Sequence, residues 1–330
     1  MQRLISCLQK ETGIADVPNL LYCDNGQIVA NPRQEFPLED IPAPDFHGLP
    51  LDLYRTKEYK EQIVLTYQMS KGCASRCSFC NLVEVSRRLA FKPYGKVITE
   101  IRQMKETYQS DMFFFCDESI NNSYEYLNGL CQAFIQNKLD IQWIAHAKAG
   151  NLDKSILKLM WESGCRRLAF GVESGSDRLL KHMNKGFTVE QAEQVIREAS
   201  QAGITVNISL IAGYPHETRE DVNRTIDFIK KNKQYINMVW VYKFSLNYGS
   251  DMFYHPERFG IANLRQGPED FCFTFDEVDG LSWEKKRAQQ KISRWRMLWA
   301  VHNAVRFSQK RHLLLHMALG NKESVSAWRE

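Results

Sequence analysis

Three cysteines lie within eight residues of one short loop, with the spacing Cys73-x-x-x-Cys77-x-x-Cys80. Thiolates are soft ligands that prefer zinc or iron–sulfur clusters. A structural zinc site needs four ligands and usually takes them as two pairs, whereas a four-iron cluster held by three local cysteines leaves one iron open to an outside ligand. The spacing favours a cluster. Half of a zinc site completed from elsewhere, or three small buried residues, are the open alternatives.

The residues around the loop extend this pattern. Gly72 precedes the first cysteine, Phe79 precedes the third, and the loop follows the apolar run 63–69, which predicts a buried strand. In these features the sequence resembles the radical S-adenosylmethionine (SAM) superfamily. The resemblance implies an oxygen-sensitive 4Fe–4S cluster on the three cysteines, with SAM on the fourth iron. It also implies a one-electron reductant such as flavodoxin or ferredoxin, and a 5′-deoxyadenosyl radical that abstracts hydrogen from a substrate.

Strand and helix patterns alternate after the loop. Strands are predicted at 111–116, 141–146, 166–171, 205–211 and 238–242, and helices at 97–108, 124–135, 152–162, 189–201 and 221–231. Such alternation predicts an α/β fold with a parallel sheet and right-handed crossovers. Together with the strand before the cysteine loop this makes six units, and the resemblance implies a partial (β/α)6 TIM-like barrel.

The two ends of the chain differ from this core. Residues 20–23 and 27–30 flank Asp24-Asn25-Gly26, which predicts a β-hairpin, and five prolines between residues 32 and 50 predict an extended connector. We therefore expect a hairpin and linker (1–52), a barrel (53–262) and a basic helical C-terminal extension (263–330).

The hairpin and linker resemble the segment that joins a cobalamin-binding domain to the barrel in cobalamin-dependent radical SAM proteins. No Asp-x-His-x-x-Gly cobalamin loop precedes Cys73. We therefore expect either a split or truncated gene, with cobalamin bound only through a separate chain, or an enzyme that works without cobalamin.

Polar residues follow the predicted strands where these end. Asp117 and Glu118 follow the second strand, Glu173 follows the fourth, and Ser209 lies in the fifth. Ligands of parallel barrels bind at these carboxyl ends. The resemblance implies that Asp117 and Glu118 contact the SAM amino group and that Glu173 contacts the ribose. Glu118 as a helix N-cap, and Glu173 as a residue serving the following helix, are the alternatives.

The resemblance also implies that adenine lies against Phe79 and the turn at Gly213. His146 and Lys148, just past the third strand, are the candidate catalytic residues, with Lys148 contacting substrate or the SAM carboxylate. His216 is predicted to be a histidine of a surface turn.

Composition limits the class of protein. The 330 residues suffice for one large α/β domain with appendages, and no apolar run approaches the roughly 20 residues of a membrane helix. The chain opens without an apolar signal-peptide core. Six further cysteines are scattered rather than paired, so we expect core positions for them and a reducing cytoplasm; Cys116 and Cys272 could face a barrel interior.

Basic residues gather near the C-terminus. Residues 285–330 carry 11 Lys or Arg against 2 Asp or Glu. A helix is predicted over 283–306 with Ile292, Trp295, Trp299 and His302 on one stripe. We expect that stripe to pack on the barrel and leave a solvated basic face. The alternative is a surface for an anionic partner such as a carrier protein or membrane headgroups; no nucleic-acid motif appears.

The sequence therefore predicts a radical SAM enzyme, with cobalamin-dependent methyl transfer as the nearest variant. A methylthiotransferase is the alternative within the enzyme class, although a second cysteine cluster and an RNA-binding appendage are lacking. A zinc- or cluster-binding interaction protein without turnover is the alternative from another class. Anaerobic reconstitution separates these hypotheses, because only the enzyme would form 5′-deoxyadenosine from SAM.

Overall fold

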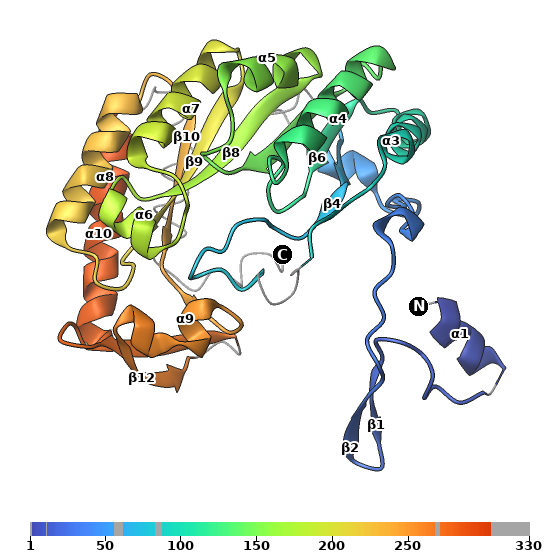
Figure 1. Ribbon diagram of the computed structural model, residues 1–330, viewed down its shortest axis with the longest axis horizontal. Coiled ribbons are helices and arrows are strands. Elements are labelled where there is room, and N and C mark those ends of the chain that lie inside the picture. The colour runs from blue at the N-terminus through green and yellow to red at the C-terminus, as the bar shows by residue number, and fades with distance from the viewer. Residues whose placement is uncertain (1, 11, 56–61, 83–87, 268–270, 305–330) are drawn as a thin grey trace. The chain divides into compact units, whose positions relative to one another are not determined.

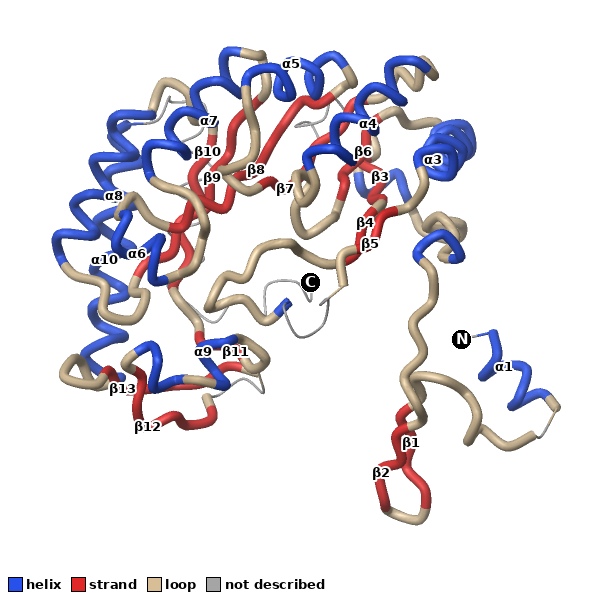
Figure 2. Tube along the Cα trace, in the orientation of Figure 1, coloured by secondary structure: helices blue, strands red, loops and turns tan. Residues whose placement is uncertain are grey.

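The computed structural model describes residues 2–10, 12–55, 62–82, 88–267 and 271–304 (Figures 1 and 2). The chain divides into two compact units, with the division between Pro42 and Ala43. Each unit is described by itself.

The first unit contains a helix and a hairpin. Helix α1 spans Gln2–Gln9, and strands β1 (Leu21–Asp24) and β2 (Gln27–Ala30) pair antiparallel. Asn25 and Gly26 both have positive φ, at 48° and 80°. The type I′ turn of a two-residue hairpin loop requires positive φ at both positions. The predicted hairpin is confirmed. The connector that follows contains a short 3₁₀ turn, η1 (Leu38–Asp40).

The second unit is built on a six-stranded sheet with the order β10-β9-β8-β7-β6-β3. All five neighbouring pairs are parallel. The strands are β3 (Val64–Tyr67), β6 (Met112–Phe115), β7 (Gln142–Ala147), β8 (Cys165–Glu173), β9 (Thr205–Ala212) and β10 (Met238–Lys243). Strands β3 and β10 are the two edges of the sheet, so the fold is a partial barrel. The predicted α/β class is confirmed.

Helices alternate with these strands and cover one face of the sheet (Figure 1). They are α3 (Tyr94–Tyr108), α4 (Tyr124–Gln136), α5 (Lys154–Glu162), α7 (Val189–Gln201) and α8 (Arg219–Asn232). Their starts follow from local chemistry, since Ser123 and Asp153 cap the backbone amides of α4 and α5, and Thr188 and Thr218 form capping boxes at α7 and α8.

The two faces of the sheet differ in side-chain size. Along β8, Leu168, Phe170 and Val172 are fully buried in the core beneath the helices. The alternate positions Ala169 and Gly171 face the other side, because successive side chains of a strand point to opposite faces. At these two positions of β8 the concave face therefore carries small residues, where a closed barrel would be filled by bulky ones.

Several elements were not predicted. Helix α6 (Asp177–His182) follows β8, and strands β4 (Ser70–Lys71) and β5 (Ala90–Phe91) pair on either side of the cysteine loop. A short 3₁₀ turn, η2 (Leu51–Tyr54), precedes β3.

Beyond β10, strands β11 (Leu246–Asn247), β12 (Ile261–Gln266) and β13 (Cys272–Glu277) form an antiparallel sheet in the order β11-β13-β12. Helix α9 (Asp251–Tyr254) and the turn η4 (Pro256–Phe259) connect β11 with β12. The boundary expected at residue 262 falls inside β12.

The core expectation for the scattered cysteines was wrong at several positions. Cys131 and Cys165 are buried, but Cys23 and Cys116 are exposed. Cys116 directly follows the end of β6, where the chain leaves the sheet, and its side chain is exposed instead of lying in the core. Cys272 lies in the small sheet, with its thiol near the side chains of Ser245 and Asn247.

Helix α10 (Trp283–Ala304) packs with the opposite face from the one expected. Trp295 and Trp299 of the predicted stripe are more than half exposed, whereas Met297 and Val301 are buried. The reason is that the inward face also carries polar side chains satisfied by strand-end carbonyls. Gln290 Nε2, for example, donates to the carbonyl oxygens of Gly213 and Phe244.

Among the described residues, none of the helices combines the length and the apolar character needed to cross a membrane.

Candidate active site

A cavity of about 430 Å³ lies at the carboxyl ends of strands β7 to β10. The three cysteines of the loop line it, together with side chains from the ends of four strands and from the segment between α6 and α7. Its lining includes Cys73, Cys77, Phe79, Cys80, Glu118, His146, Lys148, Glu173, Lys185, Ser209, Trp240 and Tyr242. Small-molecule sites have volumes of this order. The structure therefore brings most of the predicted site residues to one cavity.

Neighbouring elements fix the cysteine loop at both ends. Gly72 has a φ of +92°, a conformation that glycine adopts without strain. The side-chain amide of Asn122 donates to Gly72 O at 3.1 Å and accepts from the N–H of Ala74 at 3.1 Å. At the far end the N–H of Ser78 donates to Met183 O at 3.0 Å. The loop is thus attached to the second and fourth strand–helix connections.

The three thiols form no disulfide and are partly buried. Burial raises the pKa of Cys77 and of Cys80, and the ammonium of Lys185 acts in the opposite direction on both thiols. A metal centre would replace the protons of these thiols, because the thiolate is the ligand form.

The donor set fits an iron–sulfur cluster. Within the described part of the chain, no three His, Cys, Asp or Glu side chains converge closely enough to hold a single metal ion. In a four-iron cluster each thiolate binds a different iron, so the three thiols surround a space instead of meeting at one point. Cys73, Cys77 and Cys80 all border the same cavity in this way.

Glu173 occupies a strained position at the end of β8. Its φ is +68°, and the β8–β9 register shifts between Gly171 and Glu173. A Cβ on Gly171 would lie 2.7 Å from Glu173 Oε1. Any residue other than glycine at this position would therefore displace the carboxylate. Left-handed φ in a residue of this type is uncommon and costs about 1–3 kcal/mol, which the surrounding contacts must offset.

Both oxygens of Glu173 have partners in the cavity. Lys185 Nζ lies 3.3 Å from Oε1, and Ser209 Oγ donates to Oε2 at 3.4 Å. Burial alone would lower the pKa of Lys185, but the Glu173 carboxylate outweighs it and raises that pKa above the ordinary value. Lys185 therefore stays charged and holds the carboxylate that the sequence assigned to the SAM ribose.

Asp117 and Glu118 point to different places. Asp117 is almost fully buried outside the cavity, and its Oδ1 accepts from the N–H groups of Met69 and Ser70 and from the Ser70 hydroxyl. Burial raises the pKa of Asp117 to about 6. Asp117 thus holds strand β4 at the start of the cysteine loop, and the structure does not bring it into the cavity.

Glu118 lines the cavity, and its buried Oε2 has no hydrogen-bond partner among the described residues. A buried carboxylate oxygen without a partner is costly, and a cationic ligand group in the cavity would satisfy it. The alternative of a helix cap does not apply to Glu118, because Ser123 caps α4, the helix that follows it.

His146 and Lys148 line the cavity from β7 and from the residues after it. Burial lowers the pKa of His146, which keeps its ring neutral at pH 7, and Phe114 packs edge-on against that ring at 5.4 Å. The backbone of Lys148 is held on both sides by the amide of Asn121. The ammonium of Lys148 has no carboxylate partner among the described residues.

Phe79 lines the cavity beside Lys185, whose Nζ lies 5.8 Å from the ring centroid. Gly213 does not reach the cavity. It has a φ of +77°, and a Cβ there would meet Gln290 Cγ at 2.0 Å, so this turn serves the docking of α10. His216 is also outside, bonded to Gly260 O at 3.0 Å.

Among the lining residues missed by sequence reasoning are Trp240, Tyr242 and Lys185. Trp240 and Tyr242 alternate along β10, and the two-residue period of a strand could have placed them on one face. Lys185 lies between α6 and α7, outside any periodic pattern, and no signal in the sequence identifies it.

A second cavity of about 430 Å³ continues along the concave face toward the amino ends of the strands. It shares His146, Ala169 and Trp240 with the first. Of these shared residues, Ala169 has the smallest side chain. The concave face therefore has room for more than SAM alone.

Comparison with known proteins agrees with this geometry. Residues 67–229 match the family described as the radical SAM superfamily. An uncharacterized methyltransferase of Pyrococcus horikoshii is 29% identical over 233 residues, which cover 70% of this chain and 50% of that protein. Cytidylyl-2-hydroxyethylphosphonate methyltransferase of Streptomyces wedmorensis is 25% identical over 210 residues, covering 59% of this chain and 39% of that protein. This chain thus spans half or less of the length of these relatives.

Two solved structures share the fold. The radical SAM methyltransferase TsrM of Kitasatospora setae, with cobalamin and a [4Fe-4S] cluster bound, has a TM-score of 0.66 at 18% identity, covering 82% of this chain and 56% of that one. OxsB, a cobalamin-dependent SAM radical enzyme with aqua-cobalamin and SAM bound, has a TM-score of 0.69 at 16% identity, covering 97% and 53%. At these identities the likeness establishes the fold.

Proposed function

We propose that this chain, whose residues 67–229 match the radical SAM superfamily, is the catalytic part of an enzyme that cleaves SAM reductively and methylates an organic substrate. The observation that carries this proposal is the single cavity at the carboxyl ends of the strands, which is bordered by Cys73, Cys77 and Cys80 and by the carboxylates Glu118 and Glu173.

The residues of the cavity have complementary roles in this proposal. The three cysteines hold a 4Fe–4S cluster, which when bound supplies the electron that splits SAM into methionine and a 5′-deoxyadenosyl radical. Glu118 accepts a hydrogen bond from the SAM amino group through its unpartnered oxygen. Glu173, held by Lys185 and Ser209, accepts from the ribose hydroxyls.

The remaining lining residues orient the substrate. Lys148 presents an ammonium without a carboxylate partner in the described chain, which suits an anionic group of the substrate or the SAM carboxylate. His146 is neutral and lines both cavities, so one of its ring nitrogens can donate a hydrogen bond and the other can accept one.

Methyl transfer is favoured by the two relatives described above, which are named as methyltransferases. In both solved structures cobalamin is bound as well. The described residues of this chain comprise the barrel and its appendages, so any cobalamin would be held by a separate chain or a further part of the protein. A one-electron reductant such as flavodoxin or ferredoxin in the reducing cytoplasm would complete the system.

Anaerobic reconstitution with iron and sulfide tests the proposal. We expect about four irons per chain, and 5′-deoxyadenosine on addition of dithionite and SAM; S-adenosylhomocysteine would appear in addition where SAM also donates its methyl group. Cys80→Ala should abolish both products. The matched control is Cys116→Ala, because that thiol is exposed and outside the cavity. Zinc bound in place of iron, with SAM left intact, would overturn the proposal and favour a binding protein.

A further inference from the structure

Helix α10 presents an exposed aromatic ridge, formed by Ile292, Trp295 and Trp299. These side chains are 60%, 56% and 54% exposed, and their spacing of three and four residues places them on one stripe. The rings of Trp295 and Trp299 stack with centroids 6.0 Å apart and an interplanar angle of 16°. Adjacent exposed tryptophans are typical of contact surfaces, where they are enriched. The ridge is therefore a candidate interface.

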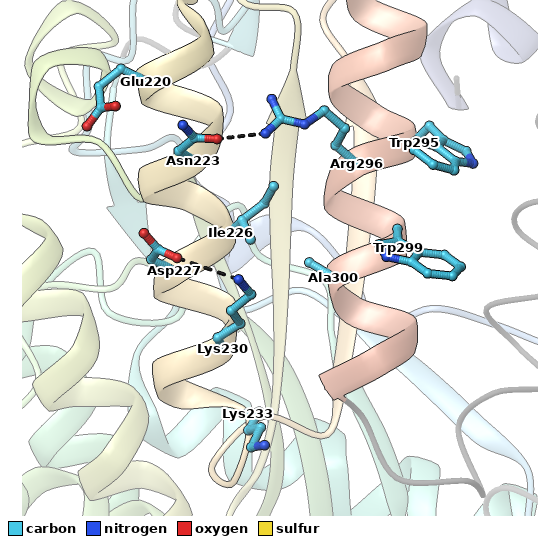
Figure 3. A pocket seen from close by; sticks show the side chains of 10 residues that line it. All are labelled: Glu220, Asn223, Ile226, Asp227, Lys230, Lys233, Trp295, Arg296, Trp299 and Ala300. Carbon is cyan, nitrogen blue, oxygen red and sulfur yellow. Dashed lines mark hydrogen bonds and ion pairs between the residues drawn. The ribbon is translucent and has the colours of Figure 1, made fainter.

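A groove of about 690 Å³ adjoins the ridge, between α8 and α10. Figure 3 shows the two indoles on the side of α10 away from α8, while Arg296 reaches across to Asn223 with a hydrogen bond of 2.6 Å. Ile226 and Ala300 contribute apolar surface to the groove. Its other lining residues are charged: Glu220, Asp227, Lys230 and Lys233.

The groove offers what an indole ring needs. An indole has one N–H donor and no acceptor, and its face attracts cations. The carboxylates of Glu220 and Asp227 form exposed ion pairs with Arg224 and Lys230, at 3.2 and 3.8 Å, and each keeps acceptor capacity for an N–H. The ammonium of Lys233 can lie on a ring face. No hydrogen bond of the indole N–H of Trp295 or Trp299 is found among the described residues. Ridge and groove are thus chemically complementary.

Both halves of this match lie side by side on one chain, since Trp295 and Trp299 themselves form one wall of the groove. A surface that contains a projection and its complement can pair with itself about a two-fold axis, in which each copy gives and receives the same contact. We propose that a second copy of this chain occupies this patch, with the two α10 helices antiparallel and each ridge seated in the groove of the other copy.

The size of the patch sets the strength of the pairing. A tryptophan side chain buries about 150–250 Å², so four half-exposed indoles and the groove surfaces that cover them account for about 800 Å². With Ile292 and the charged rims the interface approaches the ~1,000 Å² of a specific contact. A contact of this size belongs to the weak, reversible class, so we expect a dissociation constant on the order of 10 μM.

Sedimentation velocity of the full chain between about 0.1 and about 100 μM brackets that constant. The wild type should pass from monomer to dimer with concentration. Trp295→Lys or Trp299→Lys should raise the dissociation constant at least about 30-fold, as the loss of a central hot-spot residue does. The matched control is Trp161→Lys, another partly exposed tryptophan on α5, distant in sequence from the patch, which should dimerise as the wild type does.

Circular dichroism of each variant verifies that the helices remain, so that a loss of dimer reports the interface. A further variant tests the groove side: Asp227→Lys should weaken the dimer as the ridge variants do. A wild type that stays monomeric throughout the range overturns the proposal. So does a dimer that both ridge variants leave unchanged. A monomer that dimerises only after removal of residues 305–330 would assign the patch to the chain's own tail and also overturn it. None of these outcomes depends on the radical chemistry.

Discussion

Replacing Lys185 by methionine removes the ammonium that holds Glu173 while keeping a side chain of similar length. The two groups lie 3.3 Å apart, and both side chains are nearly inaccessible to solvent. At an effective dielectric constant of about 20, a pair at this distance attracts by about 5 kcal/mol. Loss of one partner of a buried pair leaves an uncompensated charge and costs about 3–5 kcal/mol.

We therefore expect Lys185→Met to lower the free energy of unfolding by about 3 kcal/mol, since Ser209 remains as a weaker partner of the carboxylate. The affinity for SAM should fall as well, because the carboxylate loses the cation that fixes its position. Urea unfolding measures the first quantity, and isothermal titration of SAM into the reconstituted protein measures the second.

Two controls separate electrostatics from packing. Lys185→Arg retains the charge and should restore most of the SAM affinity. The double variant Glu173→Gln/Lys185→Met should be more stable than Lys185→Met alone, because the buried charge is gone. The reasoning is refuted if Lys185→Met loses less than about 1 kcal/mol, the range of an exposed pair, and binds SAM like the wild type.

Further predictions concern three single positions. Gly171→Ala should weaken SAM binding with little loss of secondary structure, measured by titration and circular dichroism, because its Cβ would stand 2.7 Å from Glu173 Oε1; unaltered affinity would contradict this. Gly213→Ala should destabilise the fold by about 2 kcal/mol or more, since it combines a positive φ with a clash against Gln290. Iron content after reconstitution should stay at the wild-type value. Thermal unfolding measures the first quantity and iron analysis the second. The pKa of Asp117 is raised to about 6, so the folded protein binds a proton there that the unfolded chain binds only near pH 4; its contribution to stability therefore falls as pH rises from about 4 to about 6. Asp117→Asn should remove that part of the pH dependence, which unfolding curves across this range would reveal.

The regular part of the fold could be predicted because the sequence patterns are strong. Period-two and helical patterns identified all six strands of the main sheet and the five helices that cover it, and α7 was placed with its observed ends, Val189 and Gln201. The capping boxes at Thr188 and Thr218 also depend only on residues close in sequence. The spacing of residues in the sequence could not decide which way the side chains at the strand ends point. Asp117 and Glu118 are neighbours at a strand end, and neighbouring side chains point to opposite faces.

Two further features depend on tertiary contacts that no local pattern records. Lys185 reaches Glu173 from a segment without periodicity, so only the folded chain joins them. The orientation of α10 was mispredicted because its aromatic stripe is the stronger apolar signal. Lys286 and Gln290 are buried instead, since Lys286 Nζ donates to Tyr214 O at 2.7 Å and pairs with Glu277.

The central claim is that Cys73, Cys77 and Cys80 hold a cluster whose fourth iron faces the cavity. Electron paramagnetic resonance of the anaerobically reconstituted, dithionite-reduced protein tests this most directly, with spectra recorded before and after SAM is added. We predict a reduced 4Fe–4S signal that changes when SAM binds. A signal that SAM leaves unchanged, or a protein that binds no iron through these cysteines, would contradict the account.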